Sequence, residues 1–459
     1  MATLRFDVVV IGGGGTGSEI AFRLAERSDL KIAIAERDRL GGECNHYGCV
    51  PTKVMLKSAK VAATARDGDR FGVRVPGPVR VDLSAVRERV RRVIDQQSGE
   101  GTKPFLERGI DVFLQQMRLI GPHELELADG TRVRADRVVL ATGTEASVPP
   151  VPGLAGGPYW TNREAIWAPD RAPDRLIVIG AGSIGVEFSQ IYARFGSDVT
   201  LLEIAPHLLP SEDADVAEAL RPALEGDGIV ARAGVTIDRA EHGTGGWTVS
   251  LEGGESLHAD EVLVAAGRRP VFDGHDLAAA GVELGPGGRP VLDARLRTTA
   301  DHVWAAGDAT GELLFTHVGA YEAELVVDDI LGSPRSRDYR VVPRVTFCDP
   351  EVASVGLTEA GAEEEGHDVV TSVSPIADNE RAHIDGDLTG IVKLLADRTT
   401  GEILGGHIVA EGAGAMIHEV AIAMAGRVPI RSVADAIHAY PTLSESVKGA
   451  CAELAERLR

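Results

Sequence analysis

A β-rich run that leads directly into a glycine turn constrains this chain more than any other feature. The run is FDVVVI, and Gly12, Gly14 and Gly17 follow it in the spacing G-x-G-x-x-G. A helical pattern (SEIAFRLAER) comes next, and the strand-like run KIAIAE then ends on Glu36. The glycines let the backbone approach a pyrophosphate at the helix N-terminus, and the acid accepts a hydrogen bond from a ribose hydroxyl. This first fingerprint (6–36) predicts a dinucleotide-binding unit.

The same arrangement occurs a second time in the middle of the chain. LIVIGAGSIG places Gly180, Gly182 and Gly185 in the same spacing. The helical pattern VEFSQIYARFG follows, and DVTLLE ends on Glu203. Together they form a second fingerprint (176–203). Two fingerprints imply two bound dinucleotides, or a repeat in which one copy is idle. The first interpretation is favoured because both copies keep every chemical element.

The acid of the second fingerprint indicates which nicotinamide nucleotide binds there. Glu203 suits a free ribose 2′-hydroxyl, whereas it would repel a 2′-phosphate, which calls for Arg instead. The residues after Glu203 (IAPHLLP) offer only His207 as a cation. The sequence therefore predicts NAD rather than NADP.

Length and charge limit the possible classes of protein. At 459 residues the chain is too long for one hydrophobic core. Its apolar runs are broken before about 18 residues, so no membrane-spanning helix is predicted. The first residues lack a signal-peptide pattern. A formal charge of −22 argues against nucleic acid or an anionic membrane as a partner. We expect a cytoplasmic protein.

Composition also suggests where the chain divides. Pro and Gly gather at 143–175 and again at 332–343. The region after 343 has no glycine fingerprint. It contains two short strand-like runs, a β-hairpin pattern at 392–409 and the Ala-rich helical pattern MIHEVAIAMAG. We expect it to form a separate α+β domain.

Two of the four cysteines form a close pair in the stretch GGECNHYGCVPTK. Four cysteines are too few for a secreted disulfide scaffold. A continuous helix would hold the Cα atoms of Cys44 and Cys49 roughly 8 to 9 Å apart, whereas a disulfide needs less than about 7 Å. A bridging conformation must therefore be distorted, and Gly41, Gly42 and Gly48 supply the backbone freedom for it.

The residues after Cys49 indicate how its thiol is tuned. VPTK has the pattern of a helix start, so the thiol feels the helix dipole and the charge of Lys53, which both lower its pKa. A zinc site would need two more ligands, and neither Cys348 nor Cys451 lies in a Cys or His cluster. Inert buried thiols would not need three flanking glycines. We predict a strained, reducible Cys44–Cys49 disulfide with one stabilised thiolate, and no resident metal.

Longer motifs extend over nearly the whole chain. They are GGEC-x4-CVPTK, ATG at 141–143, GAGSIGVE, TTADHVWAAGD, FCDPEVASVGLTE and HAYPTLSE. With these motifs the chain resembles the class I pyridine nucleotide–disulfide oxidoreductases, the family that contains dihydrolipoyl dehydrogenase, glutathione reductase and mercuric reductase. The resemblance implies an α/β fold with two Rossmann-like dinucleotide-binding domains, one for FAD and one for NAD, and a C-terminal α+β dimerisation domain.

The resemblance also implies domain boundaries and an assembly. Residues 1–147 would form the FAD-binding domain with the redox-active disulfide, 148–270 the NAD-binding domain, 271–338 a central segment that completes the FAD domain, and 339–459 the dimerisation domain. The protein would be a homodimer in which each active site is shared between subunits.

Several cofactor contacts follow from the resemblance. FAD would bind at the first fingerprint and NAD(H) at the second. Asp308 would contact the flavin ribityl chain, and Thr316 would lie where the backbone meets the flavin. Lys53 would lie beside the reactive flavin nitrogen and pair with Glu187. Further nucleotide contacts are implied at Gly121, Gly143, Val235 and Gly267.

The implied reaction takes a hydride from NADH to the flavin, which then reduces the cysteine pair. Cys49 would remain near the flavin as the charge-transfer thiolate, and Cys44 would be the thiol that attacks the substrate. The protein's part is to position the cofactors and tune the thiolates.

The C-terminal motif departs from the family pattern His-x-His-Pro-Thr-x-x-Glu. Here His438 and Glu445 are present, but Tyr440 occupies the position of the acid–base His that the Glu orients. Tyr titrates near pH 10 and His near 6.5, so Tyr is a poor base at neutral pH. Losing a tuned base forfeits roughly 10² to 10⁴ in proton-transfer rate.

Three functional hypotheses follow. The first is a mercuric-reductase-like enzyme that reduces a soft metal ion, a quinone or an unusual disulfide. Thiolates bind soft cations without proton transfer, although the usual C-terminal cysteine pair of mercuric reductases is reduced here to Cys451. The second is a dihydrolipoyl-dehydrogenase-like enzyme that uses Tyr440 or His438 as the base. The third, of another class, is a redox sensor without turnover.

Overall fold

The computed structural model describes residues 3–99 and 101–458, which form two compact units. The first unit runs to Val54 and adds Arg87–Ser147 and Arg268–Asp338; the second contains Met55–Val86, Val148–Gly267 and the chain from Tyr339 onward. Residues 55–86, which lie inside the predicted FAD domain, thus belong to the second unit. The predicted domain boundaries remain a prediction.

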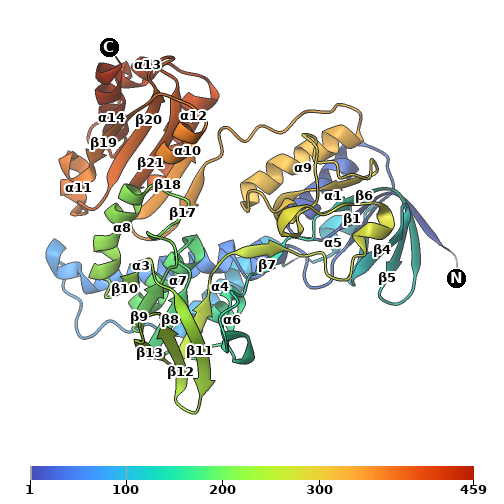
Figure 1. Ribbon diagram of the computed structural model, residues 1–459, viewed down its shortest axis with the longest axis horizontal. Coiled ribbons are helices and arrows are strands. Elements are labelled where there is room, and N and C mark those ends of the chain that lie inside the picture. The colour runs from blue at the N-terminus through green and yellow to red at the C-terminus, as the bar shows by residue number, and fades with distance from the viewer. Residues whose placement is uncertain (1–2, 100, 459) are drawn as a thin grey trace. The chain divides into compact units, whose positions relative to one another are not determined.

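A seven-stranded sheet forms the centre of the first unit, in the order β3-β2-β1-β6-β5-β4, with β16 paired to β6 (Figure 1). Its strands are β1 (Leu4–Ile11), β2 (Ile32–Ala35), β3 (Asp111–Phe113), β4 (Met117–Gly121), β5 (Glu124–Leu127), β6 (Arg132–Leu140) and β16 (Val303–Ala305). The pairs β1–β2, β2–β3, β1–β6 and β6–β16 are parallel. Strand β16 therefore brings a distant part of the chain into the first sheet.

Strand β1 shows why its sequence is almost continuously apolar. Val8 and Val10 pack on one face of the sheet, in a core shared with helices α1 (Gly15–Arg27) and α9 (Thr316–Ile330). Val9 and Ile11 pack on the other face, with apolar residues of β4 and β5. Because successive side chains of a strand point to opposite faces, a strand covered on both sides needs an unbroken hydrophobic run.

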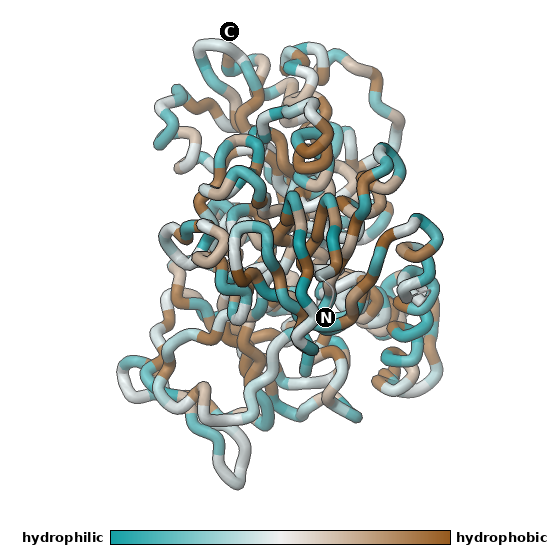
Figure 2. The backbone as a smooth tube through the Cα atoms, turned by 90° about the vertical axis from the view of Figure 1, so that its right-hand side faces the viewer, coloured by the Kyte–Doolittle hydropathy of each residue, from teal (hydrophilic) through white to brown (hydrophobic). Residues whose placement is uncertain are grey.

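The second unit contains a parallel four-stranded sheet in the order β10-β9-β8-β14. Its strands and helices are β8 (Arg175–Ile179), β9 (Asp198–Leu202), β10 (Val230–Arg232), β14 (Glu261–Val264), α6 (Asn162–Trp167), α7 (Ser183–Phe195) and α8 (Ala214–Gly226). An antiparallel sheet follows, made of β11 (Ile237–Gly243), β12 (Gly246–Leu251) and β13 (Ser256–Ala259). In Figure 2 many of the loops are teal or white, and brown stretches gather along strands.

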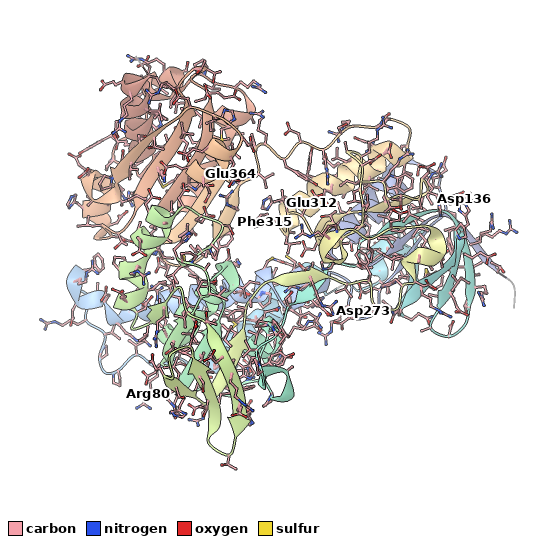
Figure 3. All side chains as sticks on the ribbon, in the orientation of Figure 1. Arg80, Asp136, Asp273, Glu312, Phe315 and Glu364 are labelled. Carbon is pink, nitrogen blue, oxygen red and sulfur yellow. The ribbon has the colours of Figure 1, made fainter. Side chains whose placement is uncertain are left out.

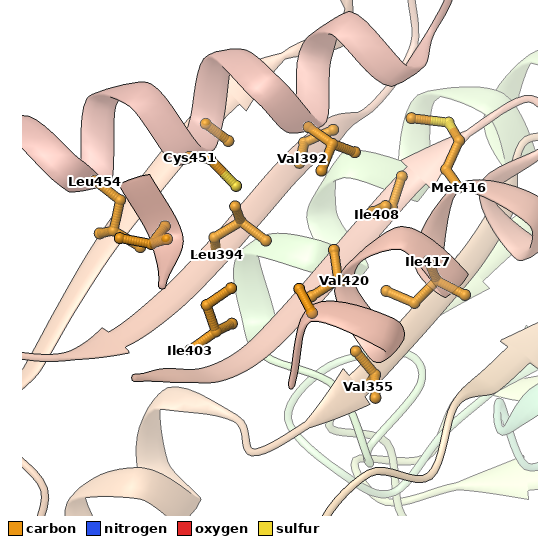
Figure 4. Close-up of a cluster of buried hydrophobic side chains, with 14 of the residues drawn as sticks. Val355, Val392, Leu394, Ile403, Ile408, Met416, Ile417, Val420, Cys451 and Leu454 are labelled. Carbon is orange, nitrogen blue, oxygen red and sulfur yellow. The ribbon is translucent and has the colours of Figure 1, made fainter. Parts of the chain in front are cut away.

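A five-stranded antiparallel sheet follows in the order β17-β18-β21-β20-β19. Its elements are β17 (Arg344–Thr346), β18 (Glu351–Gly356), β19 (Val369–Pro375), β20 (Ile391–Asp397), β21 (Ile403–Ala410), α10 (Glu359–Glu364), α11 (Glu380–Asp385), α12 (Ala413–Ala425), α13 (Ile430–Asp435) and α14 (Ser444–Arg457). The predicted hairpin and Ala-rich helix are confirmed as β20–β21 and α12. Figure 4 shows Cys451 of α14 among Val392, Leu394 and Leu454 of this core.

The α-helices and strands not yet named complete the described chain. They are α2 (Gly42–His46), α3 (Cys49–Arg66), α4 (Leu83–Ser98), α5 (Lys103–Leu106) and the antiparallel pair β7 (Thr144–Ala146) and β15 (Arg268–Pro270). Within residues 3–99 and 101–458, no helix combines the length and apolar character needed to span a membrane.

Candidate active site

Two glycines of the first fingerprint are required by the packing of the protein itself. Gly12 has φ +107°, and a Cβ atom there would lie 2.1 Å from the carbonyl oxygen of Ala141. A Cβ on Gly17 would lie 1.9 Å from the carbonyl oxygen of Gly12. The turn between β1 and α1 therefore closes only with glycine at both positions.

The middle glycine has a different explanation. Gly14 has an ordinary φ of −67°, and the nearest atom to a Cβ there is the Cα of Gly42, 4.0 Å away. Packing within the described chain does not require glycine at this position. A bare backbone at the start of α1, which has no side-chain cap and no acid in its first turn, suits a pyrophosphate group.

Glu36 braces this turn from the end of β2. Its Oε2 accepts a hydrogen bond from the backbone N–H of Gly13, and its Oε1 accepts one from that of Asp38, both at 2.7 Å. A pocket beside the acid is lined in part by Gly12, Glu36, Gln115, Thr142 and His275. In the described part of the chain the buried Oγ1 of Thr142 has no hydrogen-bond partner. These features fit the dinucleotide end of FAD.

The second fingerprint repeats this geometry in the second unit. Gly180 has φ +100°, and Cβ atoms on Gly180 and Gly185 would lie 2.5 and 1.8 Å from backbone oxygens. A Cβ on Gly182 would meet nothing within 4 Å among the described residues. The residues therefore fit a second dinucleotide, NAD(H).

The acid of the second fingerprint is also held by backbone donors. Glu203 is buried, and its two oxygens accept from the N–H groups of Ala181 at 2.6 Å and Ala205 at 2.9 Å. Val235 donates its N–H to the carbonyl of Glu203 at 2.9 Å, so it supports the backbone of the acid. Gly267, with φ +108°, follows β14 on the adjacent edge.

The cysteine segment is bent where the sequence predicted distortion. Helix α2 ends at His46 and α3 begins at Cys49. Gly41 and Gly42 have φ values of +94° and +59°, and a Cβ on Gly42 would lie 2.7 Å from the Cα of Gly14. The segment is therefore docked against the first glycine turn. Both cysteines are in the reduced thiol form in this structure.

The side chain of Thr316 contacts both sulfurs of the pair. Its Oγ1 lies 3.3 Å from the sulfur of Cys44 and 3.6 Å from that of Cys49. Thr316 begins α9, directly after Phe315, which Figure 3 labels. The family resemblance implied only a backbone contact at this position, so the sequence missed this role of the side chain.

The two thiols are not equivalent. A hydrogen bond with Cys49 raises the pKa of Cys44 far above its usual value, and burial raises it further. The hydrogen bond from Thr316 and the charge of Lys53 oppose this rise. Cys44 therefore holds its proton more firmly than a free thiol does, and the negative charge of a Cys49 thiolate opposes the loss of that proton.

A chain of polar contacts links the cysteine loop to Asp308, which lies in the short 3-10 helix Gly307–Thr310. Burial raises the pKa of Asp308, and its Oδ2 accepts from the hydroxyl of Thr144 at 3.1 Å. Arg268 donates to the hydroxyl and the carbonyl of Thr144, both at 2.8 Å, and lies 3.3 Å from Glu43 beside Cys44. Sequence reasoning missed Arg268, whose only signal was its place after Gly267.

Two further glycines of the first unit have backbone roles. Gly143 has φ +70°, and its carbonyl accepts from the N–H of Val271 at 3.1 Å. Gly121 ends β4. The cofactor contacts predicted at both positions remain predictions.

Tyr440 stands on the surface of the second unit, 71% exposed. A hydrogen bond to Glu380 raises the pKa of its phenol, and the negative charges of Glu380 and Glu445 add to the shift. Glu445 accepts from the N–H of Thr442 at 3.1 Å. No local sequence signal pointed to Glu380, which is 60 residues away in the chain.

His438 is engaged elsewhere. Its Nε2 lies 2.7 Å from Oε1 of Glu419 on α12, and its side chain is only 9% exposed. The imidazole and the carboxylate form a pair that sequence reasoning also missed, because Glu419 reads as an ordinary helix residue.

The remaining predicted residues lie as follows. Glu187 is buried on α7, and its Oε1 accepts from the N–H of Phe347 at 2.9 Å. The Lys53–Glu187 ion pair remains a prediction. Cys348 and Cys451 are buried, and burial raises the pKa of both, that of Cys451 to about 12.

We call each glycine turn together with its acid a nucleotide cradle; the first is Gly12–Gly17 with Glu36, and the second is Gly180–Gly185 with Glu203. Two nucleotide cradles and a pair of thiols beside the first cradle define a nucleotide-dependent thiol oxidoreductase. Residues 6–323 match the family described as pyridine nucleotide-disulphide oxidoreductase, and 342–451 match its dimerisation domain. The chain belongs to the pyridine nucleotide-disulphide oxidoreductase family. The predicted fold class, with two dinucleotide-binding domains and a C-terminal domain, is confirmed.

The similarity to individual relatives extends over nearly the whole chain. It is 37% identical to dihydrolipoyl dehydrogenase of Chlorobaculum tepidum over 458 residues, 97% of this chain and 96% of that one. It is 33% identical to mercuric reductase of Bacillus cereus over 448 residues, 96% of this chain and 70% of that one. The HOCl-induced flavoprotein disulfide reductase RclA from Escherichia coli has a similar structure, with a TM-score of 0.87, 30% identity and coverage of 97% and 99%.

Membership of this family settles the general chemistry. The protein is an NAD(P)H-dependent flavoprotein oxidoreductase whose cofactors are FAD and NAD(H). Residues 342–451 form the dimerisation domain through which family members make homodimers.

Proposed function

We propose that the protein uses NADH to reduce a small oxidant, a soft metal ion, a quinone or an unusual disulfide, in the cytoplasm. Bound FAD supplies the step from hydride donor to thiols. Cys49 holds negative charge, Cys44 delivers electrons to the oxidant, and the glycine turns orient the two nucleotides. In the homodimer, the C-terminal domain of the other subunit completes each site.

The observation that carries this proposal is the state of Tyr440. Its hydrogen bond to Glu380 raises the pKa of a phenol that already titrates near pH 10. Such a group does not accept a proton at neutral pH, so it cannot serve as the base of a disulfide reductase. Soft metal ions do not require that base, because thiolates bind them directly. A structure related to this chain is described as a Cu(II) complex of RclA.

A second candidate is a dihydrolipoyl-dehydrogenase-like disulfide reductase. The His438–Glu419 pair favours it, because a carboxylate 2.7 Å from an imidazole holds the ring in one orientation. In this alternative His438, two residues from the usual position, handles the proton.

Steady-state turnover with NADH, run beside NADPH, tests the two candidates. We expect activity with Hg(II), Cu(II) or a quinone, little activity with lipoamide or glutathione disulfide, and a preference for NADH. Tyr440→His should raise disulfide reduction, whereas Tyr440→Phe should leave metal or quinone turnover unchanged. Strong lipoamide activity of the unmodified enzyme, lost in His438→Gln, would establish the second candidate instead.

A redox sensor without turnover makes a different prediction. An anaerobic NADH titration of the holoenzyme should produce two titratable thiols and long-wavelength thiolate–flavin absorbance. Absence of both would show that electrons do not reach the cysteine pair.

A further inference from the structure

Three chain segments meet at the cysteine pair, and one of them brings a hydroxyl group. Cys44 lies in α2, Cys49 begins α3, and Thr316 begins α9. The separations of 3.3 and 3.6 Å between Oγ1 and the two sulfurs are hydrogen-bond distances for sulfur. A single side chain, 267 residues beyond Cys49, therefore bridges both reacting atoms.

A threonine hydroxyl has one donor hydrogen and two acceptor lone pairs. Two sulfurs that share one proton offer one acceptor of full negative charge, and the charge can lie on either sulfur. A hydrogen bond to a charged acceptor is about twice as strong as one between neutral groups. The hydroxyl therefore strengthens its bond to whichever sulfur becomes the thiolate.

The pair needs such a donor because Cys44 tends to keep its proton and yet must lose it to attack the oxidant. Cys44 keeps its proton, since Cys49 beside it carries the negative charge and burial disfavours a second charge. The attack on an oxidant requires the thiolate of Cys44. Tyr440 occupies the position that the resemblance assigns to the base, and its phenol does not accept a proton at neutral pH. Help for Cys44 must come from groups near the sulfurs.

We propose that Thr316 is a catalytic residue whose hydroxyl donates a hydrogen bond to the sulfur of Cys44 as that thiol loses its proton. The proposal rests on the proposed function, in which Cys44 delivers electrons to the oxidant. With a disulfide oxidant, the Cys44 thiolate attacks one sulfur, the oxidant's S–S bond breaks, and the leaving thiolate takes a proton from solvent. The Cys49 thiolate then attacks Cys44, which forms the Cys44–Cys49 bond and releases the second thiolate. This thiolate takes up a proton equivalent to the one that Cys44 gave to solvent. Thr316 keeps its own proton throughout.

The test measures alkylation of Cys44 by iodoacetamide as a function of pH, since only the thiolate reacts. The holoenzyme is reduced with a phosphine, so the result does not depend on electron transfer from NADH. Trypsin releases both cysteines in residues 40–53, and fragmentation in the mass spectrometer separates modification of Cys44 from that of Cys49. Failure of the proposed function would appear in steady-state turnover and in the NADH titration, whereas failure of this proposal would appear only in the alkylation profile.

Thr316→Val removes the hydroxyl and keeps the shape. We expect Cys44 to react about tenfold more slowly at pH 7, with its titration moved to higher pH. Thr316→Ser should restore the unmodified profile. Ser98→Ala is the matched control. It removes the hydroxyl that accepts a 2.7 Å hydrogen bond from Asn45, which lies on α2 beside Cys44, and it does not touch a sulfur. Should the valine variant lose flavin, Thr316→Ala takes its place. Identical pH profiles for the unmodified protein and the hydroxyl-free variant would overturn the proposal.

Discussion

The two fingerprints are nearly identical as cradles, but the segments that follow their acids differ. In both, the third glycine faces the carbonyl of the first, with Cβ distances of 1.9 and 1.8 Å, and the acid accepts from the N–H after the first glycine. After Glu36 the chain turns back onto its own glycine turn and presents the thiols. After Glu203 it presents three acids, Glu212, Asp213 and Asp215, to residues of the five-stranded sheet.

The two segments after the acids are held in place by different interactions. The segment after the first acid packs through glycines, Gly42 against Gly14. The segment after the second acid is held by charge. Glu212 lies 2.9 Å from Arg344 and 3.2 Å from His407, and Lys393, with its side chain 1% exposed, lies within 3.0 Å of Asp213. The two cradles are thus alike, but only the first is followed by the segment that carries the thiols.

The largest effect is expected from alanine at the third glycines, because a Cβ would overlap a backbone oxygen in both cradles. Gly17→Ala and Gly185→Ala should each cost about 3 kcal/mol, but their consequences should differ. Gly17→Ala should lose bound flavin, whereas Gly185→Ala should keep it and fail to be reduced by NADH. Visible absorbance and thermal unfolding distinguish these outcomes. Flavin loss in both variants would mean that the cradles are not independent.

The charged docking of the second fingerprint predicts acid sensitivity. Burial alone would raise the pKa of Glu212, but its hydrogen bond to His407 and the charge of Arg344 lower it from 4.5 to about 2. A carboxyl with a lowered pKa in the folded state contributes stability above its unfolded value, and that stability is lost as pH falls from about 4.5 to 2. We expect roughly 3 kcal/mol at neutral pH.

Denaturant unfolding across this pH range provides the measurement. Glu212→Gln should lower stability at pH 7 and approach the unmodified protein near pH 2. The control is Glu218→Gln on α8, whose carboxylate forms an exposed pair with Arg221 and should contribute little. An unchanged difference between Glu212→Gln and the unmodified protein at pH 7 and pH 2 would contradict the assignment.

The sequence predicted what depends on local patterns. Glycine spacing, the acids after the strands, the break between Cys44 and Cys49 and the β20–β21 hairpin each leave a signature within a few residues. It did not predict Arg268 beside Glu43, the hydroxyl of Thr316 on the sulfurs, or Glu380 beside Tyr440. These contacts join residues far apart in the chain, and Arg, Thr and Glu are mostly ordinary surface residues. Only the tertiary fold brings these residues into contact.

The smallest effect on stability is expected from substitutions at the middle glycines, Gly14 and Gly182. These substitutions should report most directly on nucleotide binding. Alanine at Gly14 or Gly182 meets at most one ordinary protein contact and adopts the observed φ without strain. Thermal stability of the protein stripped of nucleotides should therefore stay within about 0.5 kcal/mol. The added methyl group would occupy the position that a pyrophosphate approaches.

Affinity is the quantity that should change. Gly182→Ala should weaken NADH binding about tenfold and leave flavin content intact, whereas Gly14→Ala should weaken FAD binding by a similar factor. Calorimetric titration of each nucleotide measures both, and Gly245→Ala, where a Cβ meets nothing within 4 Å, controls for the substitution itself. Unchanged affinities would mean that the openness at these positions has a cause other than the dinucleotides, and the likeness of the two cradles would then carry no functional meaning.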